Sequence, residues 1–299
     1  MIQLKTIDSH IHFPFGEMPL KTKERKDMKE NEWIKKDQKK WRLAWNFLPP
    51  ENGFSKEDLI EKWYEETITK ELDKVVFVTA GGNENAVEII SKHPDRFIAY
   101  AHHHPETPKS AEILEEYLKK GLKGYKILAP AIEKPISDSS FYPLWEILEK
   151  RELPLLIHFG ILGGSGGIAW QKNINPLNIH DVAKNFPNLN IIIPHFGCGY
   201  VFETLNLCWA CPNVSIDTSG SNQWMNWMPY EVSLNSLFKK YRETIGAERI
   251  IFGTDSSYFP RGFAKAYHEE QIRAMVYSGY SESEIEMVLS GNIKKILKI

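Results

Sequence analysis

Asp8-Ser9-His10-Ile11-His12 follows a short strand expected over residues 4–8, and three similar stretches come later in the chain. They are Leu156-Ile157-His158, Ile193-Pro194-His195 and Ile251-Phe252-Gly253-Thr254-Asp255. In each stretch a histidine or an aspartate stands where an apolar run ends. Imidazole nitrogens and carboxylate oxygens are the ligands that a divalent ion of zinc type prefers, and a catalytic site keeps one coordination position open. The pattern therefore predicts a catalytic metal site built on the ends of parallel strands.

Short β-rich runs alternate with amphipathic helical patterns along the whole chain. A capping box from Ser281 to Glu284 predicts a closing helix over residues 281–289. Eight strand–helix units in a chain of 299 residues predict an α/β fold, a (β/α)8 TIM barrel that forms a single domain over residues 1–299. The expected strands are residues 4–8, 74–78, 97–101, 124–128, 155–158, 191–195, 214–217 and 249–253, and the main helices are residues 84–92, 111–120, 142–151, 179–185, 200–210 and 234–245.

Composition limits the classes of partner. The 37 Lys and Arg residues nearly balance 39 Asp and Glu residues, for a formal net charge of -2, which argues against nucleic acid or an anionic membrane. A small-molecule substrate is therefore expected. No run of about 18 apolar residues is found, and three cysteines suit a reducing compartment, so we expect a soluble, cytoplasmic protein. Cys208 and Cys211 form an isolated C-x-x-C, which favours buried thiols over a metal knuckle.

A long insertion, residues 13–54, separates the first strand from its helix. It is rich in lysines and acids and contains Trp33, Trp41 and Trp45. One interpretation is a helical segment that packs its tryptophans on the barrel rim. The other is a lid that supplies a cation such as Arg42 or an aromatic wall to the substrate. We favour the lid, because long βα insertions usually serve the site in this fold.

The positions of the histidines in the expected barrel favour a metal site. His10 and His12 lie two residues apart on a strand, so both side chains are expected on the same side of the pleat. A single buried histidine is more often a hydrogen-bonded core residue than a ligand. Here His158, His195 and Asp255 also fall at the C-terminal strand ends, where barrel active sites lie. Their coincidence favours the metal site.

These motifs, with Pro194-His195-Phe196-Gly197 and Ser290-Gly291-Asn292, resemble the amidohydrolase superfamily. The resemblance extends from Asp8 to Asn292 and is strongest to the branch that includes aminocarboxymuconate semialdehyde decarboxylase and γ-resorcylate decarboxylase. It implies a TIM barrel of the metal-dependent hydrolase type with one divalent metal ion, zinc first and manganese second. The implied metal ligands are His10, His12, His158 and Asp255, and His195 would be a nearby catalytic or substrate-orienting residue. Relatives of this kind often pair, so a homodimer is a candidate assembly.

Two reactions fit this ligand set. A bound divalent ion lowers the pKa of water toward about 7 and polarises a carbonyl group, which suits hydrolysis of a small amide, ester or lactone through metal-activated water. Asp255 would then move the proton, and His195 would stabilise the developing oxyanion. The alternative is non-oxidative decarboxylation of an aromatic or unsaturated carboxylic acid, with Asp255 or His195 protonating carbon. A competing class is a non-catalytic barrel that binds a metal or ligand, although every expected ligand is present.

Candidate substrate-binding residues carry weaker signals. Lys126 stands at the end of the fourth strand, where binuclear members of the superfamily hold a carboxylated lysine between two ions. We favour instead an ion pair in the barrel mouth or contact with an anionic substrate. His102 in His102-His103-His104 is expected to line the pocket. Trp224 could either pack on the barrel rim or form an aromatic wall for a planar ring. Arg261 could pair with a substrate carboxylate or serve no role, and the sequence favours neither.

Overall fold

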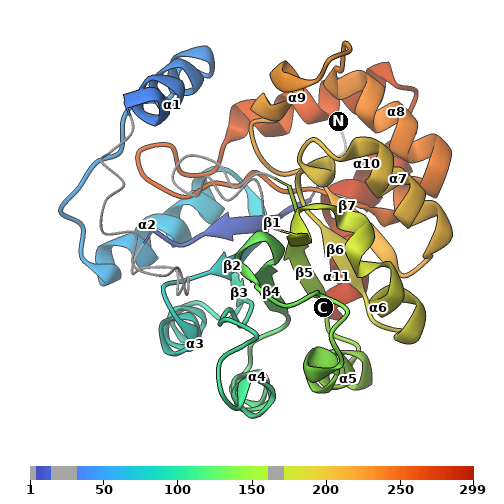
Figure 1. Ribbon diagram of the computed structural model, residues 1–299. Helices are drawn as coiled ribbons and strands as arrows, with labels where there is room; N and C mark the ends of the chain where they lie inside the picture. The colour runs from blue at the N-terminus through green and yellow to red at the C-terminus, as the bar shows by residue number, and fades with distance from the viewer. Residues whose placement is uncertain (1–4, 15–31, 161–171) are drawn as a thin grey trace.

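Parallel strands form the centre of the computed structural model, which describes residues 5–14, 32–160 and 172–299, and helices surround them (Figure 1). Two hydrogen-bonded sheets are present, β1-β2-β3 and β4-β5-β6-β7-β8. The strands within these described ranges are β1 (Thr6–His12), β2 (Leu72–Thr79), β3 (Phe97–Ala99), β4 (Tyr125–Leu128), β5 (Leu155–His158), β6 (Ile191–Ile193), β7 (Val214–Asp217) and β8 (Ile250–Ile251).

Isolated parallel bridges join the two sheets into a ring. Ala101 pairs with Tyr125 between β3 and β4, and Ile11 pairs with Ser256 between β1 and the segment after β8. All strand pairs are parallel and follow chain order. The predicted α/β architecture, a (β/α)8 barrel, is therefore confirmed.

The helices lie around the strands as the periodic patterns predicted, and α1 stands apart from this ring in Figure 1. The capping box of the closing helix is present, since Ser281 Oγ accepts from Glu284 N at 3.2 Å and Glu284 Oε2 accepts from Ser281 N at 2.8 Å. The sequence patterns gave no residue ranges for helices α2, α9 and α11. The α-helices in the described ranges are α1 (Glu32–Ala44), α2 (Lys56–Thr69), α3 (Asn83–Lys92), α4 (Ser110–Lys119), α5 (Tyr142–Arg151), α6 (His180–Asn185), α7 (Val201–Ala210), α8 (Leu234–Ile245), α9 (Lys265–Tyr277), α10 (Glu282–Glu286) and α11 (Asn292–Leu297).

None of the helices in the described ranges has both the length and the apolar character needed to span a bilayer.

An aliphatic layer inside the barrel supports the functional end. On β5, Leu156 belongs to this layer and His158 stands two residues further along, on the same face of the strand. On the β3 side, Ile98 and Tyr100 lead to His102 in the same way. The layer comprises Ile7, Val76, Val78, Ile98, Tyr100, Leu156, Ile192, Ile251, Ile293 and Leu297. Polar side chains therefore begin where the apolar filling of the barrel ends.

Two strand boundaries differ from the prediction. β1 extends to His12, four residues past the expected end at residue 8, and the extension includes both His10 and His12. β6 ends at Ile193, because Pro194 has no N–H group with which to continue the ladder. The next residue, His195, has a φ angle of 59° and begins a tight turn. This turn, and not a strand, sets the direction of the His195 side chain.

Gly253 is expected to be essential for the packing of the strand ends. A Cβ atom there would lie 2.9 Å from His10 Cβ and 3.0 Å from Ser219 Cβ, which is too close without backbone movement. We expect Gly253→Ala to lower the free energy of unfolding by about 1–3 kcal/mol. Gly291→Ala is the matched control, because its Cβ would meet nothing closer than 3.7 Å. Urea denaturation of both variants checks this, and equal stabilities would contradict it.

Candidate metal centre

The seam between β1 and the segment after β8 brings three predicted ligands together. Asp255 N donates to His10 O at 2.9 Å, which aligns the two backbones. His12 Nε2 lies 3.1 Å from Asp255 Oδ1, and His10 Nε2 lies 3.8 Å from the same oxygen. The ring centroids of His10 and His12 are 5.2 Å apart. The two histidines thus face one site, as their spacing predicted.

His195 and His158 complete the group. The His195 ring centroid is 5.0 Å from that of His10 and 5.1 Å from that of His158. Potential ligand atoms of His10, His195 and Asp255 all lie within 4.8 Å of one another. The structure therefore gathers the five residues at one end of the barrel. His195 lies as close to His10 and Asp255 as a metal ligand would, although the resemblance implied only a catalytic or substrate-orienting role for it.

Asp217 is a candidate site residue that the sequence motifs did not single out. Its Oδ2 atom lies 2.8 Å from His10 Nδ1, and its Oδ1 atom accepts from His195 N at 3.1 Å and from Ser219 N at 2.9 Å. A carboxylate on the far nitrogen of a histidine ligand fixes the ring and its tautomer. A signal existed, because Asp217 ends the seventh predicted strand just as His158 ends the fifth.

The second ring nitrogen of His10, Nε2, tests whether a metal ion fits. Since Nδ1 donates to Asp217, Nε2 carries the lone pair. That atom is buried and has no hydrogen-bond partner among the described residues. Burial lowers the pKa of His10 to about 4, so the ring is neutral at neutral pH. A neutral imidazole with a buried, unpartnered nitrogen beside a carboxylate is what a divalent cation requires, and the residues present fit such an ion.

The remaining histidines have partners that orient them. His12 Nδ1 lies 2.6 Å from Thr79 Oγ1. His195 Nδ1 lies 3.1 Å from the Ser219 carbonyl oxygen, which can only accept a proton, so Nδ1 donates and Nε2 carries the lone pair. His195 is thus held in a single tautomer with an acceptor nitrogen available.

Two carboxylates and one lysine set the charge of the site. Burial alone would raise the pKa values of Asp217 and Asp255, but hydrogen bonds and the charges of the neighbouring histidines outweigh it and hold both pKa values below the usual range. Lys126 lies inside the barrel mouth, where burial lowers its pKa to about 8 and the charges of Asp217 and Asp255 only partly offset that fall. The site therefore combines two carboxylates with one buried lysine.

Two predicted substrate residues serve the scaffold instead. His102 Nε2 accepts from Ala80 N at 3.2 Å and from Gly82 N at 2.9 Å, so it orders the loop after β2 and has no lone pair left on that nitrogen for a substrate. Trp224 is only 5% exposed and packs in the core, which fits the packing interpretation of this residue better than an aromatic wall.

The described part of the insertion packs on the rim. Trp41 Nε1 donates to Tyr267 OH at 3.0 Å, and the Trp45 ring lies 4.3 Å from the Tyr267 ring. This is the packing arrangement that we had ranked below the lid. Residues 15–31 and the Trp33 side chain lie outside the described residues.

The two predicted arginines lie near these aromatic residues. Arg261 donates to the carbonyl oxygens of Asp255 and Thr254, at 3.2 Å and 2.9 Å. Arg42 is in the last turn of α1. Burial raises the pKa of Tyr258, and the charges of Arg261 and Arg42 partly offset that rise.

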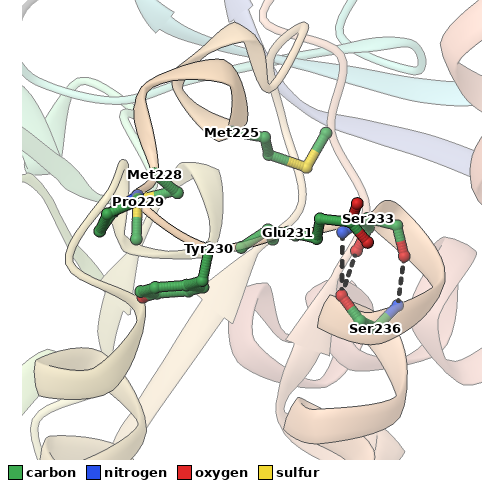
Figure 2. Close-up of a pocket in the computed structure, with 8 residues that line it drawn as sticks. Met225, Met228, Pro229, Tyr230, Glu231, Ser233 and Ser236 are labelled. Carbon is green, nitrogen blue, oxygen red and sulfur yellow. Dashed lines mark hydrogen bonds between the residues drawn. The ribbon is translucent and has the colours of Figure 1, made fainter.

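A separate open pocket of about 740 Å³ lies along the β7–α8 loop (Figure 2). Figure 2 shows Met228, Pro229 and Tyr230 on one side and the Ser233–Ser236 capping box of α8 on the other. Its lining residues are Met225, Met228, Pro229, Tyr230, Glu231, Val232, Ser233 and Ser236. None of them belongs to the histidine cluster, so this pocket is distinct from the candidate metal centre.

Comparisons with known proteins agree with the barrel fold. The structure is similar to 2,6-dihydroxybenzoate decarboxylase from Rhizobium, with a TM-score of 0.65, 16% identity and 99% coverage of both chains. It is also similar to a probable 2-pyrone-4,6-dicarboxylic acid hydrolase from Acinetobacter baumannii, with a TM-score of 0.64, 13% identity, and coverage of 99% of this chain and 100% of that one. A third similar structure is a 5-carboxyvanillate decarboxylase from Novosphingobium aromaticivorans with bound manganese, with a TM-score of 0.60, 15% identity, and coverage of 99% of this chain and 97% of that one.

These decarboxylases belong to the branch that the motifs resembled. The search of curated proteins found no match. The family model of the amidohydrolases matches residues 7–299. The chain therefore belongs to the amidohydrolase family.

Proposed function

We propose that the protein is a metal-dependent enzyme in which His10, His12, His158 and Asp255 hold one divalent cation. The observation that carries this proposal is the buried, unpartnered Nε2 atom of His10, oriented by Asp217. The donor set of imidazoles and one carboxylate suits zinc and also manganese, the ion present in one structural neighbour. His195 is assigned to proton transfer or substrate orientation beside the cation.

The first candidate reaction is hydrolysis of a small amide, ester or lactone. A bound cation would supply Lewis acidity to the substrate carbonyl and to water. Asp255, whose side chain is 35% exposed, accepts the proton of the attacking water and transfers it to the leaving nitrogen or oxygen. A carbon–oxygen bond forms from water as the bond to the leaving group breaks. His195 Nε2, with its tautomer held by Ser219, orients the water or the substrate.

Lys126 narrows the substrate class to anions. Its side chain is 3% exposed and lies where the charges of Asp217 and Asp255 act on it. A buried ammonium group at the barrel mouth would pair with a substrate carboxylate. We therefore expect the substrate to carry a carboxylate besides the group that reacts.

The same lysine is also compatible with a second candidate reaction, non-oxidative decarboxylation. Two of the structural neighbours are named as decarboxylases of aromatic acids. In this reaction Asp255 or His195 first takes a proton from water or from a substrate hydroxyl group. The carbon–carbon bond to the carboxylate then breaks, carbon dioxide leaves, and the same residue delivers that proton to the carbon. Lys126 would hold the anionic substrate in either reaction.

Isotope incorporation separates the two reactions. Hydrolysis of a carboxylate-bearing lactone, ester or amide in H₂¹⁸O places ¹⁸O in the product acid and releases no carbon dioxide. Decarboxylation of hydroxybenzoates in D₂O releases carbon dioxide and places deuterium on the former carboxyl carbon. A metal-loaded protein that processes neither class would favour a non-catalytic barrel.

The ligand set predicts a specific pattern of metal loss. His10→Ala, His12→Ala, His158→Ala and Asp255→Asn should each retain the fold and lose most bound metal, whereas His195→Gln should keep the metal and lose activity. Elemental analysis with circular dichroism measures both properties. His93→Ala is the control, because His93 stacks on Tyr64 and pairs with Glu61 outside the site. Metal loss in His195→Gln would instead make His195 a ligand.

Asp217→Asn tests the residue behind His10. Loss of the carboxylate on His10 Nδ1 should weaken zinc binding by about 10–100-fold, the usual effect of removing such a partner. Competition with a chromophoric chelator measures the affinity. An unchanged affinity would show that Asp217 only stabilises the backbone around Ser219.

Lys126 predicts how substrate binding depends on pH. Its ammonium form predominates below pH about 8 and is lost as the pH rises through that value, so KM for an anionic substrate should rise above pH 8. In Lys126→Met, KM should be high at every pH and this inflection should disappear. Steady-state kinetics from pH 6 to 10 test this, and an inflection that persists in Lys126→Met would exclude the lysine as its source.

A further inference from the structure

Arg261 holds the backbone of a proposed metal ligand. Its two Nη atoms donate to the carbonyl oxygens of Thr254 and Asp255, at 2.9 Å and 3.2 Å. A guanidinium group presents its donors in a planar fork, so one side chain can hold two consecutive carbonyl groups. The contacts are to the main chain of Asp255, and the Asp255 carboxylate stays directed at His12 and His10.

Aromatic rings enclose the guanidinium group of Arg261. Its Cζ atom lies 5.2 Å from the ring centroids of Trp41, Phe47 and Tyr267, and 6.0 Å from that of Tyr258. Rings at these distances attract a cation through the negative potential of their faces. The Nε atom is buried without a hydrogen-bond partner in the described part of the chain. This enclosure leaves the guanidinium group poorly placed for a substrate carboxylate.

The backbone of Asp255 needs such support. Its φ angle is 59°, in the left-handed region that non-glycine residues rarely adopt. A residue in such a conformation keeps it only when surrounding contacts enforce it. On one side, Asp255 N donates to His10 O and Thr254 N donates to Asp8 Oδ1. On the other side, the carbonyl groups of both residues are held by Arg261.

The enclosing rings connect this support to the insertion. Trp41 and Phe47 belong to the segment between β1 and α2, whereas Tyr258 and Tyr267 follow β8. Glu51 N also donates to Phe259 O at 2.9 Å, which ties the end of the insertion to the loop of Arg261. The described C-terminal part of the insertion is therefore packed against the group that holds Asp255.

We propose that Arg261 is a positioning residue that fixes Asp255 for metal binding, and that Trp41 and Phe47 of the insertion hold Arg261 in place. This inference rests on the proposed function, because it assumes that Asp255 binds the metal. It assigns the insertion a role in metal affinity through packing, which differs from direct contact with a substrate.

Replacement of Arg261 by methionine tests the proposal. Methionine fills the aromatic enclosure but cannot donate to the carbonyl groups, so the affinity for Zn²⁺ should fall by about 10–100-fold. The visible absorption of the Co²⁺-loaded variant should also change, because the geometry of one ligand changes. Arg261→Lys keeps a cation and one donor, and it should restore part of the affinity and of the spectrum. Phe47→Ala should weaken Zn²⁺ binding in the same direction but less.

Arg249 provides a matched control at the other end of β8. Its Nη1 atom donates to the carbonyl oxygens of Cys208, Cys211 and Val214, at 2.9 Å, 3.1 Å and 3.0 Å. Arg249→Met should therefore lower the melting temperature while the Zn²⁺ affinity of the folded protein stays within about twofold of wild type. If Arg261 only stabilised the fold, Arg261→Met and Arg249→Met would have similar Zn²⁺ affinities. If Arg261 positions Asp255, only Arg261→Met loses Zn²⁺ affinity.

Three further results would overturn the proposal. Wild-type Zn²⁺ affinity and Co²⁺ spectrum in Arg261→Met, together with metal loss in Asp255→Asn, would refute the role of Arg261 and leave the metal centre intact. Absence of metal binding by the wild-type protein would refute both the role of Arg261 and the metal centre. If Arg261→Met does not fold, a folded Arg261→Lys decides, and full wild-type affinity in that variant would show that the paired donors are not needed.

Discussion

The seam that closes the barrel is the constraint on which the site depends. His12 N donates to Ser256 O at 2.8 Å, and Asp255 N donates to His10 O at 2.9 Å. The same contacts that join the first strand to the last therefore set two histidines beside an aspartate. Any change that opens this seam separates the proposed ligands, so barrel closure and metal binding are expected to be coupled. Gly253 permits the close approach, because a Cβ atom there would meet His10.

A second carboxylate, that of Asp217, orients the histidines at the seam. Asp217 contacts the ring of His10 and the backbone of His195, so one side chain at the end of β7 orients two histidines. The cost of burying an unpartnered imidazole nitrogen is tolerated because an ion would satisfy it. Lys126 is buried near the same two carboxylates, and we propose that it binds an anionic substrate. The proposed site would then combine a cation-binding half with an anion-binding residue, which suits both reactions considered above.

Much of the fold could be predicted because local patterns and the barrel agree. Apolar runs ending in His158 or Asp217 are buried strands, and the amphipathic pattern of residues 234–245 is α8. The turn at His195 could not be predicted, since its positive φ angle depends on the surrounding contacts. The partners of His102 and Arg261 depend on loops that meet only in three dimensions. A single sequence shows a residue's chemistry but not whether neighbouring loops occupy its donors, and Arg261 could be interpreted in two ways for that reason.

The most direct measurement is an anomalous difference map from crystals of the protein grown with zinc or manganese, collected at the absorption edge of that metal. The account predicts one strong peak per chain, about 2.0–2.2 Å from the nearest histidine nitrogens and from an Asp255 oxygen. His10 Nε2 should be among those nitrogens. A second peak beside Lys126 would indicate a binuclear centre bridged by a modified lysine. A map without a peak at the His10–Asp255 seam would contradict the metal-dependent mechanism.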